Sequence, residues 1–222
     1  MARNGIVRSE KKEAFVLAQQ FDVFLLNLDG VFCLGERPLP HAVDSVARLR
    51  NWNRALRFLT NNPRPTREEI VRWLGKMGIE LRTEEVITSG WAIAEYLRRS
   101  GVRTAYVVGS PRHACEIDAA GIEIVYCVSS PGAVVVGCDE SVTYHHIRRA
   151  AASISGGAWF VATNPDGSFP APEGPLPVTG AIFEAVVAST GKRPTVAGNS
   201  TPHIRRGVDG AGHRRRADRR GR

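Results

Sequence analysis

The chain has 222 residues, and its 43% of hydrophobic and 23% of charged residues are typical of a globular protein and argue against a disordered or fibrous one. The longest apolar runs, such as residues 133–136, have the length of strands and are too short to span a membrane, so we expect no membrane partner. Residues 1–20 are expected to form a polar, helical leader. This leader lacks the apolar core of a secretory signal, so we expect a cytoplasmic protein. The net charge of +8 is concentrated in residues 203–222, which hold eight arginines and two aspartates, so the other 202 residues carry a net charge of only +2. A nucleic-acid partner is therefore not predicted, and we interpret residues 203–222 as a basic, disordered tail.

The N-terminal part of the chain alternates strand and helix patterns. Its first strand, residues 23–26, is a continuous apolar run, as expected of a parallel strand buried on both faces. Thr66 followed by Glu69 is a capping box, which predicts the start of a helix. The predicted strands here are 23–26, 56–60 and 86–88, and the predicted helices are 41–52, 66–78 and 89–99, the last capped by Ser89.

The same alternation recurs from about residue 104. The predicted strands are 105–109, 122–126, 133–136, 159–162 and 195–198, and the predicted helices are 110–120, 143–153 and 181–189. Residues 164–177 are rich in proline and glycine and are predicted to form a long loop. The whole pattern predicts an α/β fold in which a second, smaller α/β unit is inserted into the first.

Polar residues follow two of the predicted strands. The first strand ends in Asn27-Leu28-Asp29-Gly30, and the second ends in Thr60-Asn61. In parallel α/β sheets ligands bind at the carboxyl ends of the strands, and a glycine-containing turn can leave backbone amides free for an anion. Either stretch alone is most simply a strand-end turn, but the two together favour a phosphate site.

Two other groups invite a chemical interpretation. Cys33 lies beside the first of these turns and could serve as a nucleophile, although a buried structural thiol is the better interpretation. No cysteine pair has Cys-x-x-Cys spacing, and no disulfide is expected. His145 and His146 are adjacent, so they do not share one face of a helix, which favours a solvated or partly buried pair over a metal site.

Five stretches follow one another in the order of a known set of motifs: residues 28–31, 57–62, 88–90, 162–166 and 188–192. Through them the sequence, from residue 21 to about 202, resembles the haloacid-dehalogenase (HAD)-type phosphatases. The similarity is greatest to the branch that contains p-nitrophenyl phosphatase, phosphoglycolate phosphatase and ribonucleotide monophosphatase-like enzymes. The resemblance implies a Rossmann-like parallel-sheet core, residues 21–90 and 179–202, and an inserted α/β cap, residues 91–178, which covers the site and selects the substrate.

The resemblance also assigns roles in the first two motifs. In the family one aspartate attacks phosphorus to form an aspartyl-phosphate, and a second aspartate is the acid and base. Asp29 takes the acid/base position, whereas Asn27 stands at the nucleophile position. A neutral amide is a far weaker nucleophile than a carboxylate, so this covalent catalysis is expected to fail. Leu28, Asp29, Thr60 and Asn61 fall at phosphate-binding positions.

Two further features that the resemblance implies are replaced or absent. Asn199 stands where the family has a lysine that stabilises the transferred phosphoryl group. The family binds Mg²⁺ with an acidic motif of which we find no equivalent, because Asp209 and Asp218 lie in the arginine-rich tail. This leaves the backbone carbonyl of Asp29 as a weak metal ligand, and Mg²⁺ binding is not expected. The tail also has the composition of a GC-rich gene read out of frame, and we hypothesise a frameshift, which translation of the other two frames tests.

Asn164 and Asp166 lie in a stretch that in the family reaches toward the site, which predicts a contact with substrate; a turn with a helix-capping aspartate fits the residues equally well. Three functions stay open. The first is a HAD-type hydrolase of small phosphomonoesters that is inactive or strongly impaired. The second is a non-catalytic protein that binds a small phosphorylated metabolite, and the third is a nonfunctional truncated product with an exposed sheet edge. The sequence does not tell which phosphomonoester is bound or whether the chain forms a homo-oligomer.

Overall fold

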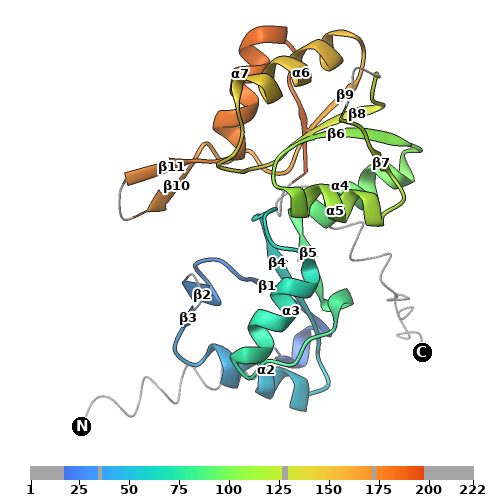
Figure 1. The fold of residues 1–222 in the computed structure, drawn as a ribbon. Coiled ribbons are helices and arrows are strands. Elements are labelled where there is room, and N and C mark those ends of the chain that lie inside the picture. Colours follow the sequence, from blue (N-terminus) through green and yellow to red (C-terminus); the bar gives the residue numbers. More distant parts are fainter. Residues whose placement is uncertain (1–17, 35–36, 127–129, 172–173, 198–222) are drawn as a thin grey trace. The chain divides into compact units, whose positions relative to one another are not determined.

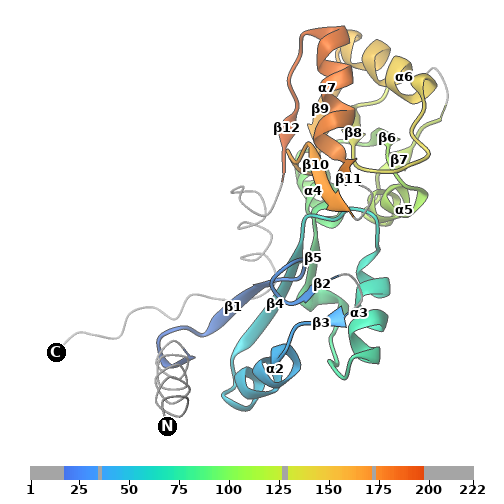
Figure 2. The same ribbon diagram turned by 90° about the vertical axis from the view of Figure 1, so that its left-hand side faces the viewer.

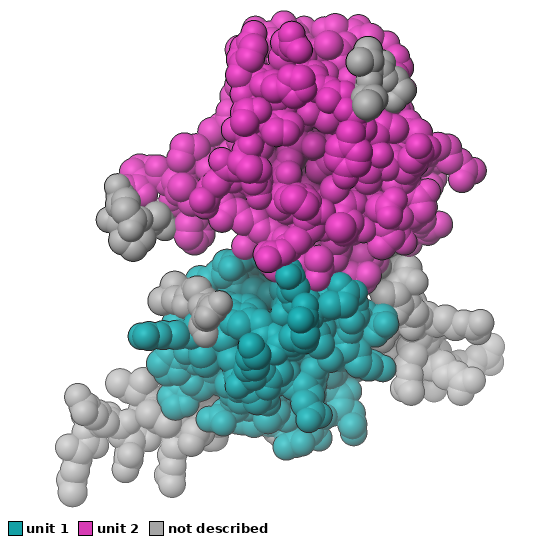
Figure 3. Space-filling view, in the orientation of Figure 1, with its two compact units in different colours: residues 1–60, 68–86 teal, residues 61–67, 87–222 magenta. Residues whose placement is uncertain are grey.

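The computed structural model describes residues 18–34, 37–126, 130–171 and 174–197 (Figure 1). It divides the chain into two compact units: unit 1 comprises residues 1–60 and 68–86, and unit 2 comprises residues 61–67 and 87–222 (Figure 3). Among the described residues, no helix has the length and apolar character needed to cross a membrane. The predicted leader up to residue 17, the position of Asn199, and the tail with Asp209 and Asp218 lie outside the described residues.

Unit 1 is built on two parallel strands, β1 (Val23–Asn27) and β4 (Ala55–Thr60), which pair in register from Val23–Ala55 to Asn27–Leu59. Both strands are rich in large apolar residues. Leu25 is exposed, because β1 is the edge strand of the sheet. Phe58 of β4 is fully buried and packs edge-on against Phe32, with ring centroids 5.7 Å apart. The remaining elements are β2 (Cys33–Leu34), β3 (Arg37–Pro38), α2 (Ala42–Asn51), α3 (Arg67–Lys76) and the 3₁₀ turn Thr83–Glu85. β5 (Val86–Thr88), which begins in unit 1 and ends in unit 2, completes the sheet order β1-β4-β5.

Unit 2 contains a five-stranded parallel sheet. The strands, in the spatial order β12-β9-β8-β6-β7, are β12 (Thr195–Val196), β9 (Trp159–Ala162), β8 (Ala133–Val136), β6 (Thr104–Val108) and β7 (Glu123–Ile124). The helices are α4 (Ser89–Arg99), α5 (Pro111–Ala119), α6 (Tyr144–Ser155) and α7 (Thr179–Thr190). Figure 1 shows α6 and α7 on one face of this sheet and α4 and α5 on the other.

The central strand β8 explains why the sheet needs helices on both faces. All four of its residues are fully buried. Ala133 and Val135 pack in a core with residues of α4 and α5, whereas Val134 and Val136 pack in a second core with residues of α6 and α7. Because side chains alternate along a strand, a continuous apolar run fits only a strand that is covered on both sides.

α7 and β12, the last described helix and strand of the chain, pack within unit 2. β12 pairs with β9, with Thr195 opposite Val161, and the two strands are neighbours in Figure 2. α7 packs on α6 and contributes Phe183 and Val186 to the core on that face. The sequence-based division placed residues 179–202 with residues 21–90 instead. The compact units group the chain by strand pairing and apolar packing, and the division into a core and an inserted cap stays a prediction.

Residues 164–177, which the sequence predicts to be a loop, contain a two-stranded hairpin. Strands β10 (Ser168–Ala171) and β11 (Gly174–Pro177) pair antiparallel, and Figure 1 shows them projecting from unit 2. The Val178 amide extends the ladder by donating to the Gly167 carbonyl at 3.2 Å. The prediction of a continuous loop is wrong for this segment.

The prolines of the hairpin are compatible with strands because of where they fall. Hydrogen-bonded and non-hydrogen-bonded pairs alternate along an antiparallel ladder. Since the Gly167–Val178 pair is hydrogen-bonded, the pairs one and three steps further on, Ser168–Pro177 and Pro170–Pro175, are the non-hydrogen-bonded ones. Their nitrogen atoms face away from the partner strand, where proline costs no ladder hydrogen bond.

One helix start also differs from the prediction. α4 begins at Ser89, and its N-cap is Thr88, whose hydroxyl accepts a hydrogen bond from the Trp91 amide at 3.0 Å. Ser89, which the sequence predicts to be the cap, instead donates its hydroxyl to the Asn61 carbonyl at 2.7 Å. Thr88 has the extended backbone of a strand end, which is the conformation that an N-cap residue requires.

Candidate functional site

The ends of β1 and β4 bring two predicted site residues of unit 1 together. Asn27 ends β1 and Thr60 ends β4, and the parallel register places both ends at one edge of the sheet. The buried Thr60 hydroxyl donates to a carboxylate oxygen of Asp29 at 2.5 Å. A short bond between a hydroxyl and a carboxylate is charge-assisted, so it fixes the Asp29 side chain next to the strand ends.

The Asn27 side chain is oriented by the same turn. Its amide nitrogen donates to the backbone carbonyl of Asp29 at 2.8 Å. Because a carbonyl only accepts hydrogen bonds, the nitrogen of Asn27 must face it, and an aspartate at this position could not make the same bond. The Asp29 carbonyl, the predicted weak metal ligand, thus accepts one hydrogen bond from Asn27, and its second lone pair is the one a metal ion would use.

The backbone amides of the turn are less available than the sequence predicts. The Leu28 amide donates to the Leu59 carbonyl at 2.8 Å, and the Gly30 amide donates to the Cys33 carbonyl at 2.9 Å. The Leu28 side chain is buried in the core of unit 1. The contribution of Leu28 to phosphate binding stays a prediction. It requires the Leu28 amide to donate to the anion as well as to the Leu59 carbonyl.

Cys33 has the properties of a structural thiol. It is 1% exposed and donates its S–H to the Leu28 carbonyl at 3.3 Å. Burial, together with the negative charge of Asp29, raises the pKa of the thiol to about 11. The thiol is neutral at physiological pH, and a neutral thiol is a poor nucleophile. The structural interpretation of Cys33 is the one that these contacts support.

The other predicted residues meet in unit 2, around the carbonyl of Asn61. This carbonyl accepts hydrogen bonds from the Ser89 hydroxyl at 2.7 Å and from the Asn164 amide nitrogen at 3.0 Å. The Asn61 amide nitrogen lies 3.5 Å from a carboxylate oxygen of Asp166, at the limit of a hydrogen bond. The structure thus brings Asn61, Asn164 and Asp166 together. Ser89 is a member of this group that the sequence did not reveal, because its partner lies 28 residues away.

Asn164 and Asp166 have different environments. Asn164 is buried, and its side-chain oxygen accepts a hydrogen bond from the Asp166 amide at 3.1 Å, which is the pattern of an Asx turn. Its amide nitrogen also lies 3.3 Å from the Thr179 hydroxyl. Asn164 therefore holds the loop, in line with the turn alternative, whereas the Asp166 side chain is exposed and keeps the capacity to contact a ligand.

The Asp166 loop packs directly on the start of α7, which gives a stability prediction. The Gly180 amide donates to the Asp166 carbonyl at 2.7 Å, and a Cβ at Gly180 would lie 2.6 Å from the carbonyl oxygens of Pro165 and Asp166. Gly180→Ala should therefore lower the free energy of unfolding by about 3 kcal/mol in urea titrations. Gly167→Ala is the matched control, because a Cβ there meets nothing within 4 Å, and equal effects of the two changes would contradict the close packing.

The described residues do not by themselves form a magnesium site. Among them, no group of three or more histidine, cysteine, aspartate or glutamate side chains is placed to hold a metal ion. Mg²⁺ prefers an octahedral set of oxygen ligands that includes carboxylates. At the strand ends of unit 1, Asp29 supplies a carboxylate that is already bonded to Thr60. His145 is exposed and His146 is half-buried, and neither belongs to such a group among the described residues.

A parallel sheet with an Asp-Thr pair at its strand ends and a second unit with helices on both faces of its sheet define a two-part α/β protein. A family model described as haloacid dehalogenase-like hydrolase matches residues 24–123. The chain is 34% identical over 187 residues to the acid sugar phosphatase of Staphylococcus saprophyticus, which covers 84% of this chain and 72% of that protein. The chain belongs to the haloacid dehalogenase-like hydrolase family.

Solved structures agree with this assignment. The p-nitrophenyl phosphatase from Archaeoglobus fulgidus superposes with a TM-score of 0.81 at 28% identity, over 85% of this chain and 73% of that one. A glycerol phosphate phosphatase from Mycobacterium tuberculosis, in complex with magnesium, superposes with a TM-score of 0.80 at 31% identity, over 87% of this chain and 59% of that one. The family and the α/β fold class predicted from the sequence are confirmed.

Proposed function

We propose that this chain binds small phosphomonoesters at the strand ends of unit 1 and hydrolyses them poorly or not at all. Its relatives are named as phosphatases of sugars and of glycerol phosphate, which supports phosphorylated sugars and polyols as the substrate class. The observation that carries the proposal is the Asn27 side chain, whose nitrogen is bonded to the Asp29 carbonyl. The position from which a carboxylate would attack phosphorus holds a neutral amide.

The loss of attack follows from charge. A carboxylate nucleophile carries a full negative charge and donates an electron pair to phosphorus while the bond to the leaving oxygen breaks, whereas an amide oxygen is neutral and its lone pairs are weakly basic. With the Asn27 nitrogen held by Asp29, rotation of the amide to present its oxygen breaks a hydrogen bond. Asp29 stands at the acid/base position of the family, but without the covalent step it has no intermediate to act on.

The groups that would hold a phosphate are still present. The Thr60 hydroxyl is buried at the end of β4, and its proton is donated to Asp29 in the absence of a ligand. A phosphate oxygen can accept the same proton when the Asp29 side chain turns away. Phosphate and Asp29 therefore compete for Thr60, and the negative charge of Asp29 opposes the bound anion.

This competition predicts opposite effects of two substitutions on binding. Thr60→Val should weaken the binding of glycerol phosphate about tenfold, because a hydrogen bond to a charged group is lost. Asp29→Asn keeps the shape but removes the negative charge, and it should strengthen binding. Isothermal titration calorimetry with glycerol phosphate and with inorganic phosphate measures both. A folded chain that binds neither probe at millimolar concentration would contradict the proposal.

A further inference from the structure

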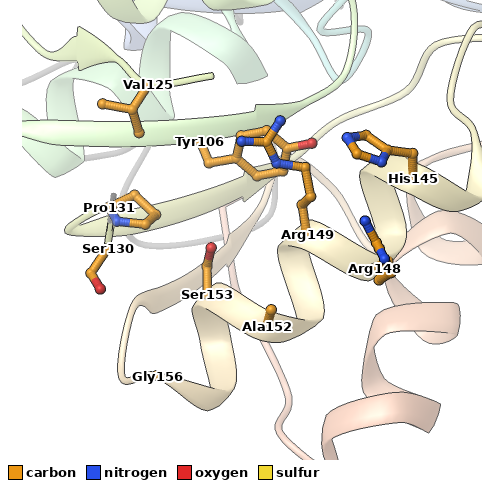
Figure 4. A pocket seen from close by; sticks show the side chains of 10 residues that line it. All are labelled: Tyr106, Val125, Ser130, Pro131, His145, Arg148, Arg149, Ala152, Ser153 and Gly156. Atoms are coloured by element: carbon orange, nitrogen blue, oxygen red, sulfur yellow. The ribbon is translucent and has the colours of Figure 1, made fainter. Parts of the chain in front are cut away.

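Unit 2 contains a cavity of about 610 Å³ that has no part in the strand-end site. Figure 4 shows side chains from α6, from β6 and from described residues between β7 and β8 around it. Its size falls within the roughly 300–1,000 Å³ range of small-molecule sites. The walls include Val125 and Pro131, so much of the lining is apolar.

The charged side chains at this cavity are all basic. Arg148 and Arg149 lie three and four residues after His145 on α6, so the three side chains share one face of the helix. None of the described residues that line the cavity is acidic. Within the part of the chain that the structure describes, neither arginine forms an ion pair or a hydrogen bond. Two guanidinium groups without a counter-charge form a favourable site for an anion.

Tyr106 of β6 adds a buried hydrogen-bonding group. The residue is 6% exposed, and its hydroxyl has no hydrogen-bond partner among the described residues. The Arg149 guanidinium lies over its ring, 5.4 Å from the centroid, an arrangement visible in Figure 4. Burial raises the pKa of this hydroxyl, so it stays protonated and able to donate. Buried hydroxyl groups are normally paired, and an unpaired one calls for an acceptor.

We propose that this cavity binds a nucleoside monophosphate. Its phosphate would lie between the guanidinium groups of Arg148 and Arg149 and accept the hydroxyl proton of Tyr106. Its flat base would cover Val125 and Pro131. A free phosphate ion would leave these apolar walls in water, and a bare sugar phosphate would place its many hydroxyl groups against them, so a ligand with an aromatic body fits the lining best.

Titration calorimetry with AMP tests the site. The wild-type chain should bind AMP with a Kd below about 1 mM, and Arg148→Gln and Arg149→Gln should each weaken binding about tenfold, because a charge-assisted hydrogen bond is lost. Tyr106→Phe should weaken it about threefold to tenfold, without the charge change. Arg103→Gln is the matched control: Arg103 is an exposed arginine of unit 2 outside the cavity lining, and its loss should leave Kd unchanged.

Two further probes and one variant separate this site from the strand-end site. Adenosine, which lacks the phosphate, and inorganic phosphate, which lacks the base, should both bind more weakly than AMP. AMP is also a phosphomonoester and can bind at the strand-end site, so the titrations are repeated in the Thr60→Val chain, in which Arg149→Gln should still weaken AMP binding. The proposal is overturned if 5 mM AMP gives no binding, if Arg149→Gln binds as tightly as Arg103→Gln, or if Thr60→Val abolishes binding while Arg149→Gln does not. Circular dichroism spectra of all variants establish that each is folded.

Discussion

With p-nitrophenyl phosphate and Mg²⁺, this chain should turn over substrate about 10⁴–10⁶-fold more slowly than the p-nitrophenyl phosphatase of Archaeoglobus fulgidus measured beside it. The magnitude is what the deletion of a catalytic nucleophile costs in other enzymes. The reason is Asn27, which presents its amide nitrogen to the Asp29 carbonyl and has no negative charge with which to attack phosphorus. Steady-state release of p-nitrophenol is the measurement. A rate within a hundredfold of the reference enzyme would contradict the role given to Asn27.

Asn27→Asp is the stringent control for this prediction, and we expect it to raise the rate by no more than about tenfold. The new carboxylate would lose the hydrogen bond to the Asp29 carbonyl and would add a second negative charge beside Asp29. Among the described residues, no cluster of acidic side chains is placed to bring a cation that would offset these charges. A rescue of a thousandfold or more would show that metal ligands are supplied from elsewhere in the chain.

The fold could be predicted from the sequence to the extent that local pattern and tertiary packing agree. The run Ala133–Val136 is apolar throughout, and it forms a strand covered on both faces. The sequence does not predict the hairpin of β10 and β11, because its high proline content is typical of a loop. Only the pairing register shows that these prolines fall at positions without ladder hydrogen bonds. The grouping of α7 and β12 with unit 2 likewise depends on partners that the sequence does not name.

In the candidate site too, some contacts follow from local sequence pattern and others depend on partners that are distant in sequence. Asp29 and Thr60 meet because parallel strands end at one edge, which the positions of two apolar runs predict. The role of Asn164 as a loop anchor depends on the Asn61 carbonyl and the Thr179 hydroxyl, which are distant in sequence. No local signal marks the basic cavity either, because Tyr106 and Arg149 come from different elements and are adjacent only in the packed unit.

His113 is the buried titratable group with the largest expected effect on stability. It lies on α5, is 1% exposed, and neither ring nitrogen has a hydrogen-bond partner among the described residues. Its ring is enclosed by Gly90, Gly109 and Gly137, and a Cβ at Gly137 would lie 2.7 Å from the ring nitrogen Nδ1. The glycines leave room for the ring and bring no compensating charge. Burial therefore lowers the pKa of His113 from 6.5 to about 4.

The depressed pKa makes folding sensitive to mild acid. Between pH 6.5 and about pH 4 the unfolded chain binds a proton at His113 that the folded chain does not bind, so the free energy of unfolding falls as the pH falls through this window. The loss should reach about 3 kcal/mol near pH 4 and change little below it. Urea unfolding at a series of pH values, followed by circular dichroism, measures the slope.

Carboxylates and other histidines titrate in the same window, so the contribution of His113 is the difference between variants. His113→Leu fills a similar volume without a titratable nitrogen, and His113→Gln keeps a polar side chain that does not titrate; each should flatten the pH dependence by the same amount. At pH 7, His113→Leu should cost little stability, because it also removes two unpaired ring nitrogens. His145→Gln, at an exposed position, should retain the slope of the wild type. If both His113 variants lose stability between pH 7 and pH 4 as steeply as the wild-type chain, the histidine is protonated in the folded state, and the enclosure by glycines must open to admit water.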